Sequence, residues 1–192
     1  MTMKDRIILD LCGGTGSWSK PYLEAGYDVR LITLPQWDVR LIEHLKFKVH
    51  GILAAPPCTE FSFAKHYHGK GKYTHNFAEG LSIVDACLRI IWLAKPLWWA
   101  LENPQGYLQR FLGPPAWKFD PWNYGDLYQK KTCLWGSANW PKLTVLDKPM
   151  GLKKFSLLKS HEIGEQPSIY SRQERRAMTP HGFAWAFFQA NP

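Results

Sequence analysis

The fold predicted for this chain is decided by residues 6–17, RIILDLCGGTGS. A short apolar strand, Arg6 to Leu11, runs directly into a glycine turn, and Pro21 lies near the first turn of the helix expected next. Glycines let a ligand approach the backbone closely, and the N-terminus of a helix favours negative charge. The segment therefore predicts the first strand, loop and helix of a ligand-binding α/β sheet, with a spacing that matches neither G-x-G-x-x-G nor a P-loop.

Strand and helix patterns alternate along much of the remaining chain. We expect further strands at 29–34, 49–55, 97–101 and 132–135, and helices at 19–26, 39–45, 77–95, from Ser171 onward and at 182–189. The helix that Ser171 opens begins with Ser-Arg-Gln-Glu, a capping-box pattern. This alternation predicts a doubly wound, mostly parallel sheet with helices on both faces, and the length suits a single domain over residues 1–192.

The composition favours a polyanionic partner. The formal net charge is +8 with an isoelectric point near 9.3, and lysines gather at 65–72, 130–131 and 153–154. Four cysteines include no C-x-x-C pair, and neither a signal peptide nor an apolar run of membrane-spanning length is recognisable. We therefore expect free thiols in a reducing cytoplasm and no membrane partner.

Two triplets follow apolar runs that read as buried strands. Pro56-Pro57-Cys58 ends the first, and Glu102-Asn103-Pro104 follows the second, with Glu102 44 residues after Cys58. Two prolines stiffen the turn that holds the thiol, and nearby positive charge lowers the pKa of a thiol. A glutamate at the end of an apolar strand is costly to bury, and protonating a ring nitrogen is a role that explains it. The pair indicates covalent attack on an electron-poor ring.

Taken together, DLCGGTG, PPCTEFS and ENP resemble the cytosine-C5 DNA methyltransferase family. The resemblance implies the class I methyltransferase (Rossmann-like) fold and S-adenosyl-L-methionine as the cofactor. Cys58 would attack C6 of an extruded cytosine, Glu102 would protonate N3, and Asn103 would help hold the loop of Cys58. The cofactor would be bound by Asp10, Leu11, Cys12, Gly13, Gly14, Thr15, Gly16, Asp38 and Pro56.

Several positions depart from the family pattern. Thr59 stands where glutamine usually follows the nucleophile, and no acidic residue ends the second strand to bind the ribose hydroxyls. Lys131 would replace the arginine that reaches the cytosine O2, and a lysine keeps the charge but loses the planar fork. The residues expected to contact nucleic acid are Ser62, Lys65, Lys70, Lys72, Gln129 and Lys130. His66 and His68 form a His-x-His pair in the loop that contains Lys65, Lys70 and Lys72. No carboxylate or cysteine joins them at the spacing of a metal site, so no metal is expected.

The family's long target-recognition domain is missing. Only residues 137–171 separate the motif near Lys131 from the C-terminal motif, a short insert in its place. Sequence specificity should therefore be relaxed or supplied by an accessory protein. Small phage-encoded relatives look like this, which implies the cytoplasm of a bacterial host cell and a monomer or weak dimer.

Two kinds of alternative remain open. The acceptor could be RNA, single-stranded DNA or a free cytosine nucleotide, and a modified cofactor could deliver a group larger than methyl. A different class is a catalytically idle DNA-binding protein that retains the fold, because fold alone does not guarantee activity.

Overall fold

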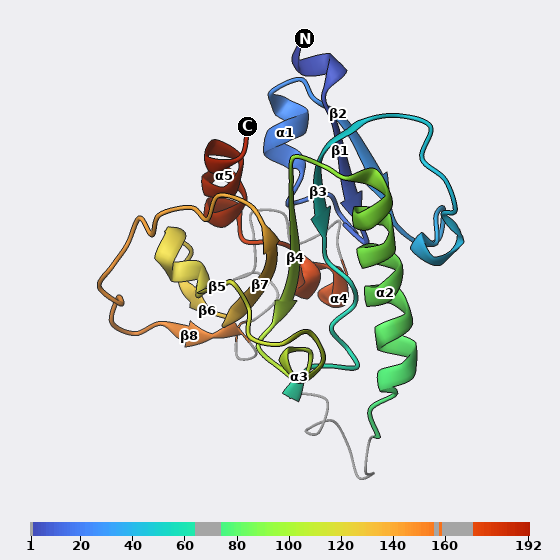
Figure 1. Cartoon of the computed structure of the whole chain (residues 1–192). Helices are drawn as coiled ribbons and strands as arrows, with labels where there is room; N and C mark the ends of the chain where they lie inside the picture. The colour runs from blue at the N-terminus through green and yellow to red at the C-terminus, as the bar shows by residue number, and fades with distance from the viewer. Residues whose placement is uncertain (1, 64–73, 156–157, 159–170) are drawn as a thin grey trace.

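A central sheet of six strands organises the computed structural model, which describes residues 2–63, 74–155, 158 and 171–192 (Figure 1). The strand order is β2 (Asp28–Ile32), β1 (Ile7–Leu11), β3 (Val49–Ala54), β4 (Trp98–Pro104), β7 (Thr132–Ser137) and β5 (Trp117–Phe119). The first four strands in this order are parallel, and β7 is antiparallel to both of its neighbours. The prediction of a mostly parallel sheet is therefore confirmed.

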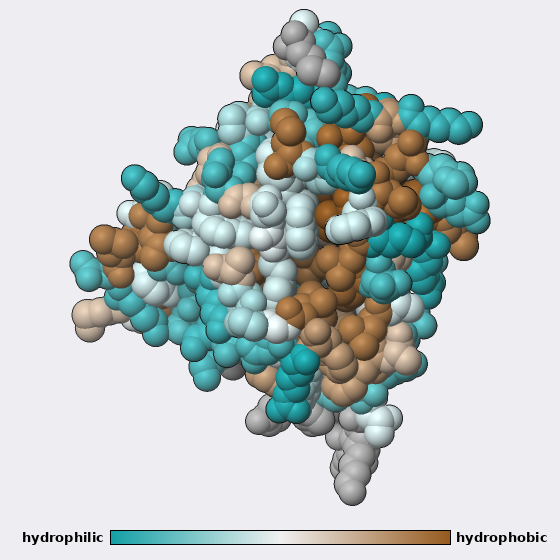
Figure 2. Space-filling model, viewed as in Figure 1, coloured by the Kyte–Doolittle hydropathy of each residue, from teal (hydrophilic) through white to brown (hydrophobic). Residues whose placement is uncertain are grey.

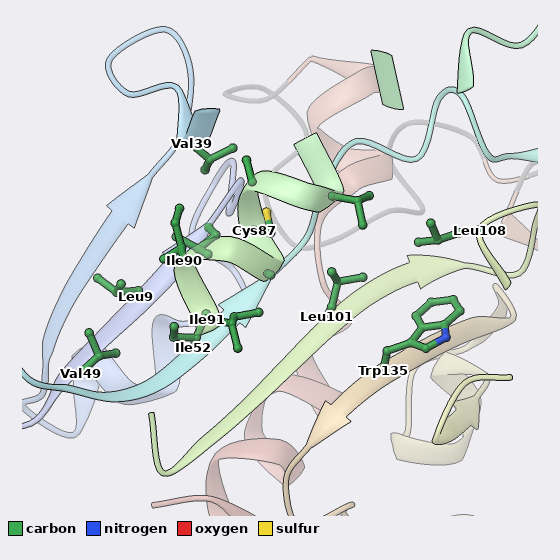
Figure 3. Packing of buried hydrophobic residues seen from close by; sticks show 14 of the residues in the cluster. Leu9, Val39, Val49, Ile52, Cys87, Ile90, Ile91, Leu101, Leu108 and Trp135 are labelled. Carbon is green, nitrogen blue, oxygen red and sulfur yellow. The ribbon is translucent and has the colours of Figure 1, made fainter. Parts of the chain in front are cut away.

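Helix α2 (Phe77–Ala94) covers one face of the sheet. Its buried residues Cys87, Ile90 and Ile91 pack against Ile52 of β3 and Leu101 of β4, among others (Figure 3). These positions follow the helical spacing of the sequence, so one apolar stripe is buried against the strands. Asn76 caps the helix by accepting a hydrogen bond from the Glu79 backbone N–H.

Helices α1 (Lys20–Glu24) and α5 (His181–Ala190) lie on the opposite face, where aromatic residues form the core. Trp18 packs edge-on to Phe187 with ring centroids 5.5 Å apart. Tyr22 donates a hydrogen bond of 2.9 Å to the Asn191 carbonyl, which ties α1 to the C-terminal end. Helices on both faces were predicted, and this layer explains part of the aromatic excess of the composition.

The remaining elements are short and lie outside the main layers. They are the 3-10 helices η1 (Met3–Asp5), η2 (Val39–Leu41) and η4 (Pro121–Tyr124), the helices α3 (Gln109–Leu112) and α4 (Arg172–Ala177), and a two-stranded sheet of β6 (Tyr128–Gln129) and β8 (Lys153–Lys154). The capping box predicted at Ser171 is present: its hydroxyl accepts from the Glu174 N–H, and the Glu174 carboxylate accepts from the Ser171 N–H. Within the described ranges, no helix is long and apolar enough to cross a membrane.

Two boundaries differ from the prediction. The prediction of a helix at 39–45 is wrong beyond the single 3-10 turn Val39–Leu41. The Arg89 guanidinium of α2 donates hydrogen bonds to the carbonyls of Val39 and Ile42, and a longer helix would need these carbonyls as its own acceptors. Strand β4 runs three residues further than expected. Glu102 pairs with Leu134 of β7, so the Glu-Asn-Pro triplet lies inside the strand rather than after it.

The described part of the 137–171 segment packs against the flank of the sheet. The side chains of Asn139 and Asn191 each donate to a backbone carbonyl on the other's segment, and the Asn139 backbone N–H donates to the Asn191 side chain. Further along, β8 pairs in parallel with β6. These contacts join the described part of the segment to the C-terminal end of the chain and to β6.

Gly51 of β3 provides a test of this packing. A Cβ atom at this position would lie 2.1 Å from the Trp98 ring, which is itself buried under the aromatic layer. We expect Gly51→Ala to lower the free energy of unfolding by about 1–3 kcal/mol through overpacking. Urea denaturation checks this, with Leu41→Ala on the exposed surface as the control; equal stability of Gly51→Ala and wild type would contradict the packing described.

Candidate active site

A cavity of about 250 Å³ opens at the carboxyl ends of β1, β3 and β4. From β1 the chain passes to β2 on one side, and from there to β3 on the other side of β1, so the strand order reverses at this point (Figure 1). Crevices at such reversals are the usual ligand sites of open α/β sheets. The lining comes from the glycine loop after β1, the Pro-Pro-Cys turn after β3 and the end of β4.

The glycine loop is shaped by close contact with the strand that precedes it. A Cβ atom on Gly13 would lie 2.3 Å from the Asp10 carboxyl carbon, so only glycine fits there. Gly14 and Cys12 both have positive φ angles, 56° and 57°. Gly14 takes this conformation without strain, whereas Cys12 is held in it by the fold and faces the cavity.

Three buried polar groups line the cavity without a hydrogen-bond partner among the described residues. They are the Asp10 Oδ1, Thr15 Oγ1 and Trp18 Nε1 atoms. The other Asp10 oxygen accepts a hydrogen bond of 2.5 Å from Ser19. Burial raises the pKa of Asp10 to about 6, and the Ser19 hydroxyl only partly offsets this effect. Buried polar groups that lack partners are destabilising unless a ligand supplies them.

Asn103 fixes the turn that carries Cys58. Its buried Nδ2 donates a hydrogen bond of 3.0 Å to the Pro56 carbonyl, two residues before Cys58. The Cys58 carbonyl in turn accepts from the backbone N–H groups of Phe61 and Ser62, each at 2.9 Å. Pro56, Cys58 and Glu102 all line the cavity, so the nucleophile and the acid expected from the sequence are brought together.

Glu102 and Lys130 both line the cavity. Burial raises the pKa of Glu102, and the charge of Lys130 acts in the opposite direction. The Lys130 ammonium lies 5.5 Å from the centre of the Phe155 ring, directly after β8. Lys131, the residue predicted to supply the cation, is exposed and does not line the cavity.

Asp38 lies in a second cavity of about 120 Å³ that shares Cys12, Leu34 and Pro57 with the first. Its carboxylate forms an ion pair of 2.7 Å with Arg40, which also contacts Glu79 of α2 at 2.9 Å. Hydrogen bonds from the Arg40 side chain and backbone hold the pKa of Asp38 below its usual value. The carboxylate is therefore oriented by the protein itself.

The other predicted site residues are placed as follows. Leu11 is fully buried in the core, Gly16 shapes the loop at φ 70°, and neither lines either cavity. Ser62 forms an isolated antiparallel β-bridge with Gly106. The Gln129 side-chain amide donates a hydrogen bond to the Leu152 carbonyl. Lys65, Lys70 and Lys72 lie outside the described residues.

Sequence reasoning missed the wall formed by the C-terminal part of the chain. Glu174, Ala177 and Thr179 line the cavity, and the Thr179 N–H donates a hydrogen bond of 2.8 Å to Ser17 beside the glycine loop. The capping box marked this helix, but no local signal could reveal contacts between residues about 160 positions apart. Within the part of the chain that the structure describes, no group of three or more His, Cys, Asp or Glu residues could hold a metal ion.

Comparison with known proteins bears on the fold. No protein-family model and no curated protein sequence matches the chain. Among solved structures, a prophage-encoded E. coli protein described as a proposed DNA modification methyltransferase matches with a TM-score of 0.52 and 18% identity. The match covers 69% of this chain and 46% of that one, so this chain spans less than half of its length. The two proteins share a fold over the matched region.

The raised pKa of Asp10 predicts a pH-dependent stability. Between about pH 4 and 6 the folded protein holds a proton that the unfolded chain releases, so stability falls as pH rises through this window and stays lower above it. We expect Asp10→Asn to remove this fall, which amounts to at most about 3 kcal/mol. Urea denaturation at pH 4 to 8 measures it. The exposed Asp147→Asn variant should keep the fall, and a wild-type pH profile in Asp10→Asn would contradict the burial of a titrating carboxyl.

Proposed function

We propose that this protein is an S-adenosylmethionine-dependent methyltransferase that modifies C5 of cytosine in DNA through a covalent intermediate on Cys58. One observation supports it above all: the Cys58 turn, Glu102 and the glycine loop line a single cavity at the strand-order reversal. The shared fold with a proposed DNA modification methyltransferase is consistent with this reaction class.

The residues of the cavity fit the amino-acid end of this cofactor. A zwitterion offers an ammonium for the unpartnered Asp10 oxygen and a carboxylate for the Trp18 Nε1–H and the Thr15 hydroxyl. Gly13 and Gly14 keep the loop open to close approach. Asp38 would lie toward the adenine end, in the adjoining cavity. When bound, the cofactor supplies an electrophilic methyl group.

Cys58 begins the reaction. Its thiolate forms a bond to C6 of cytosine, and the electron pair of the C5–C6 double bond moves into the ring while Glu102 delivers a proton to N3. C5 thereby becomes nucleophilic and takes the methyl group. A base then removes the C5 proton, and the electron pair of that C–H bond re-forms the double bond as the thiolate leaves and N3 returns its proton to Glu102.

Two features of the site suit Glu102 to this role. Burial raises the pKa of its carboxyl, so the acid keeps a proton closer to neutral pH than an exposed glutamate would. The Lys130 charge opposes this shift and can stabilise negative charge that develops on the ring at O2. We therefore assign to Lys130 the contact with the cytosine O2 that was predicted for Lys131.

The first test concerns the nucleophile. Purified protein with methyl-labelled S-adenosylmethionine and cytosine-rich duplex DNA should yield labelled 5-methylcytosine, detected by mass spectrometry of the digested nucleosides. We expect Cys58→Ala to lose this product completely while cofactor binding, measured by calorimetry, persists. Full activity of Cys58→Ala would contradict the proposal. A product found only with RNA, single-stranded DNA or free nucleotide would reassign the acceptor.

The adjacent lysines form a matched pair for the second test. We expect Lys130→Met to lower the rate by at least about tenfold and to move the limb of the pH–rate profile that reports Glu102 to higher pH, because a neighbouring positive charge is lost. Lys131→Met removes the same charge from an exposed position and, with saturating DNA, should leave that limb at its wild-type pH. Equal profiles in both variants would exclude Lys130 from the site.

A further inference from the structure

The positive charge of the chain is concentrated in one part of the described structure. Residues 1–63 carry seven lysines and arginines and seven aspartates and glutamates, so they are balanced. Residues 105–158 carry eight lysines and arginines against three aspartates and no glutamate. This second stretch includes β5, β6, β7 and β8, the flank of the sheet next to the cavity. A charge asymmetry of this kind indicates a polyanionic partner for one face.

The three acidic residues of this stretch are fewer than its eight basic residues, and two of them are not exposed. Asp126 is half-buried, and its carboxylate accepts a hydrogen bond from the Gly182 N–H. Burial raises the pKa of Asp120, and the charges of Lys131 and Lys148 act against this shift, which places both ammonium groups near that carboxyl. Only Asp147 is an exposed acid. By contrast, the ion pairs measured among the described residues all lie within residues 20–79.

Strand register places two exposed lysines close to the cavity wall. Lys154 pairs in register with Gln129 at the end of β6, and the residue that follows Gln129 in the chain is Lys130, which lines the cavity. Lys118 lies opposite Cys133 in the β5–β7 ladder, one strand from β4 and its Glu102. We call the exposed residues Lys118, Lys131, Lys148 and Lys154 the lysine ridge. Figure 2 shows hydrophilic residues over β6 and β8, whereas hydrophobic residues gather along α2.

We propose that the lysine ridge binds the phosphate backbone of DNA and so presents a strand to the cavity. This inference rests on the proposed function and extends it: the acceptor is a polymer rather than a free nucleotide, and the 137–171 segment contributes its docking surface through Lys148 and Lys154. Contacts to phosphates carry no sequence information, so this surface positions DNA without selecting a site.

The salt dependence of binding tests the ridge. Each lysine that neutralises a phosphate contributes about 0.9 to the slope of log affinity against log salt for duplex DNA. We expect Lys131→Gln with Lys154→Gln to reduce that slope by roughly 2 and to weaken binding about tenfold or more near 0.1 M salt. Fluorescence anisotropy with a labelled duplex, without cofactor, measures both quantities.

A matched control comes from the amino ends of the parallel strands, opposite to the cavity. Lys46 and Lys48 are exposed and immediately precede β3, so they lie at its amino end, and Lys46→Gln with Lys48→Gln removes the same net charge. This control should keep the wild-type slope. Equal slopes in the two double variants would overturn the ridge, and a larger ridge effect on an RNA duplex of the same sequence would also overturn the assignment to DNA.

Methyl transfer distinguishes failure of the ridge from failure of the proposed function. If the ridge variant binds DNA as the control does but wild type makes 5-methylcytosine, only the docking surface is wrong. If binding depends on the ridge but no transfer is seen and the cofactor does not bind, the surface stands and the enzymatic function is wrong.

Discussion

The site depends on the parallel pairing of β3 with β4. Ala54 lies in register with Leu101, so the chain leaves β3 beside the point where Glu102 continues β4. The buried hydrogen bond from Asn103 to the Pro56 carbonyl then links the two strands just before Cys58. Because a strand register cannot slip by one residue without turning every side chain to the other face, this pairing fixes Cys58 and Glu102 relative to each other.

The same edge of the sheet contains polar groups that reduce stability. Burial makes the ionised form of the Asp10 carboxyl unfavourable. Polar atoms of Thr15 and Trp18 lack hydrogen-bond partners among the described residues. Within the described part of the chain, the Asn103 side-chain oxygen also has no hydrogen-bond partner. Such groups are uncommon in a core selected for stability alone, and those of Asp10, Thr15 and Trp18 belong to residues that line one cavity.

Most of the α/β core could be predicted from local patterns. The glycine loop, the buried strands and the periodicity of α2 each reflect interactions within a few residues, and β1, β3, α2, α4 and α5 lie close to where they were expected. The 39–45 helix failed because Arg89, distant in sequence, binds its carbonyls. The short strands β5, β6 and β8 lack any periodic pattern and exist only through their pairing partners.

The site itself was partly predictable. Cys58 and the glycine loop follow parallel strands, Glu102 and Asn103 lie near the carboxyl end of β4, and the carboxyl ends of parallel strands meet at one edge. The sequence pattern could not predict whether Lys130 or Lys131 lines the cavity, because this depends on which of the two successive side chains turns toward it. Thr179 and Glu174 were missed for a similar reason, since only the tertiary fold returns α4 to the glycine loop.

The central claim is that Cys58 forms a bond to a cytosine whose C5 then accepts the methyl group. A DNA duplex in which fluorine replaces the C5 hydrogen cannot lose a proton at that position, so elimination stops and the protein stays attached. Incubation of this duplex with S-adenosylmethionine and mass spectrometry of the digested protein should find a methylated nucleotide on the peptide that contains Cys58. No adduct, or an adduct on Cys12 instead, would contradict the account.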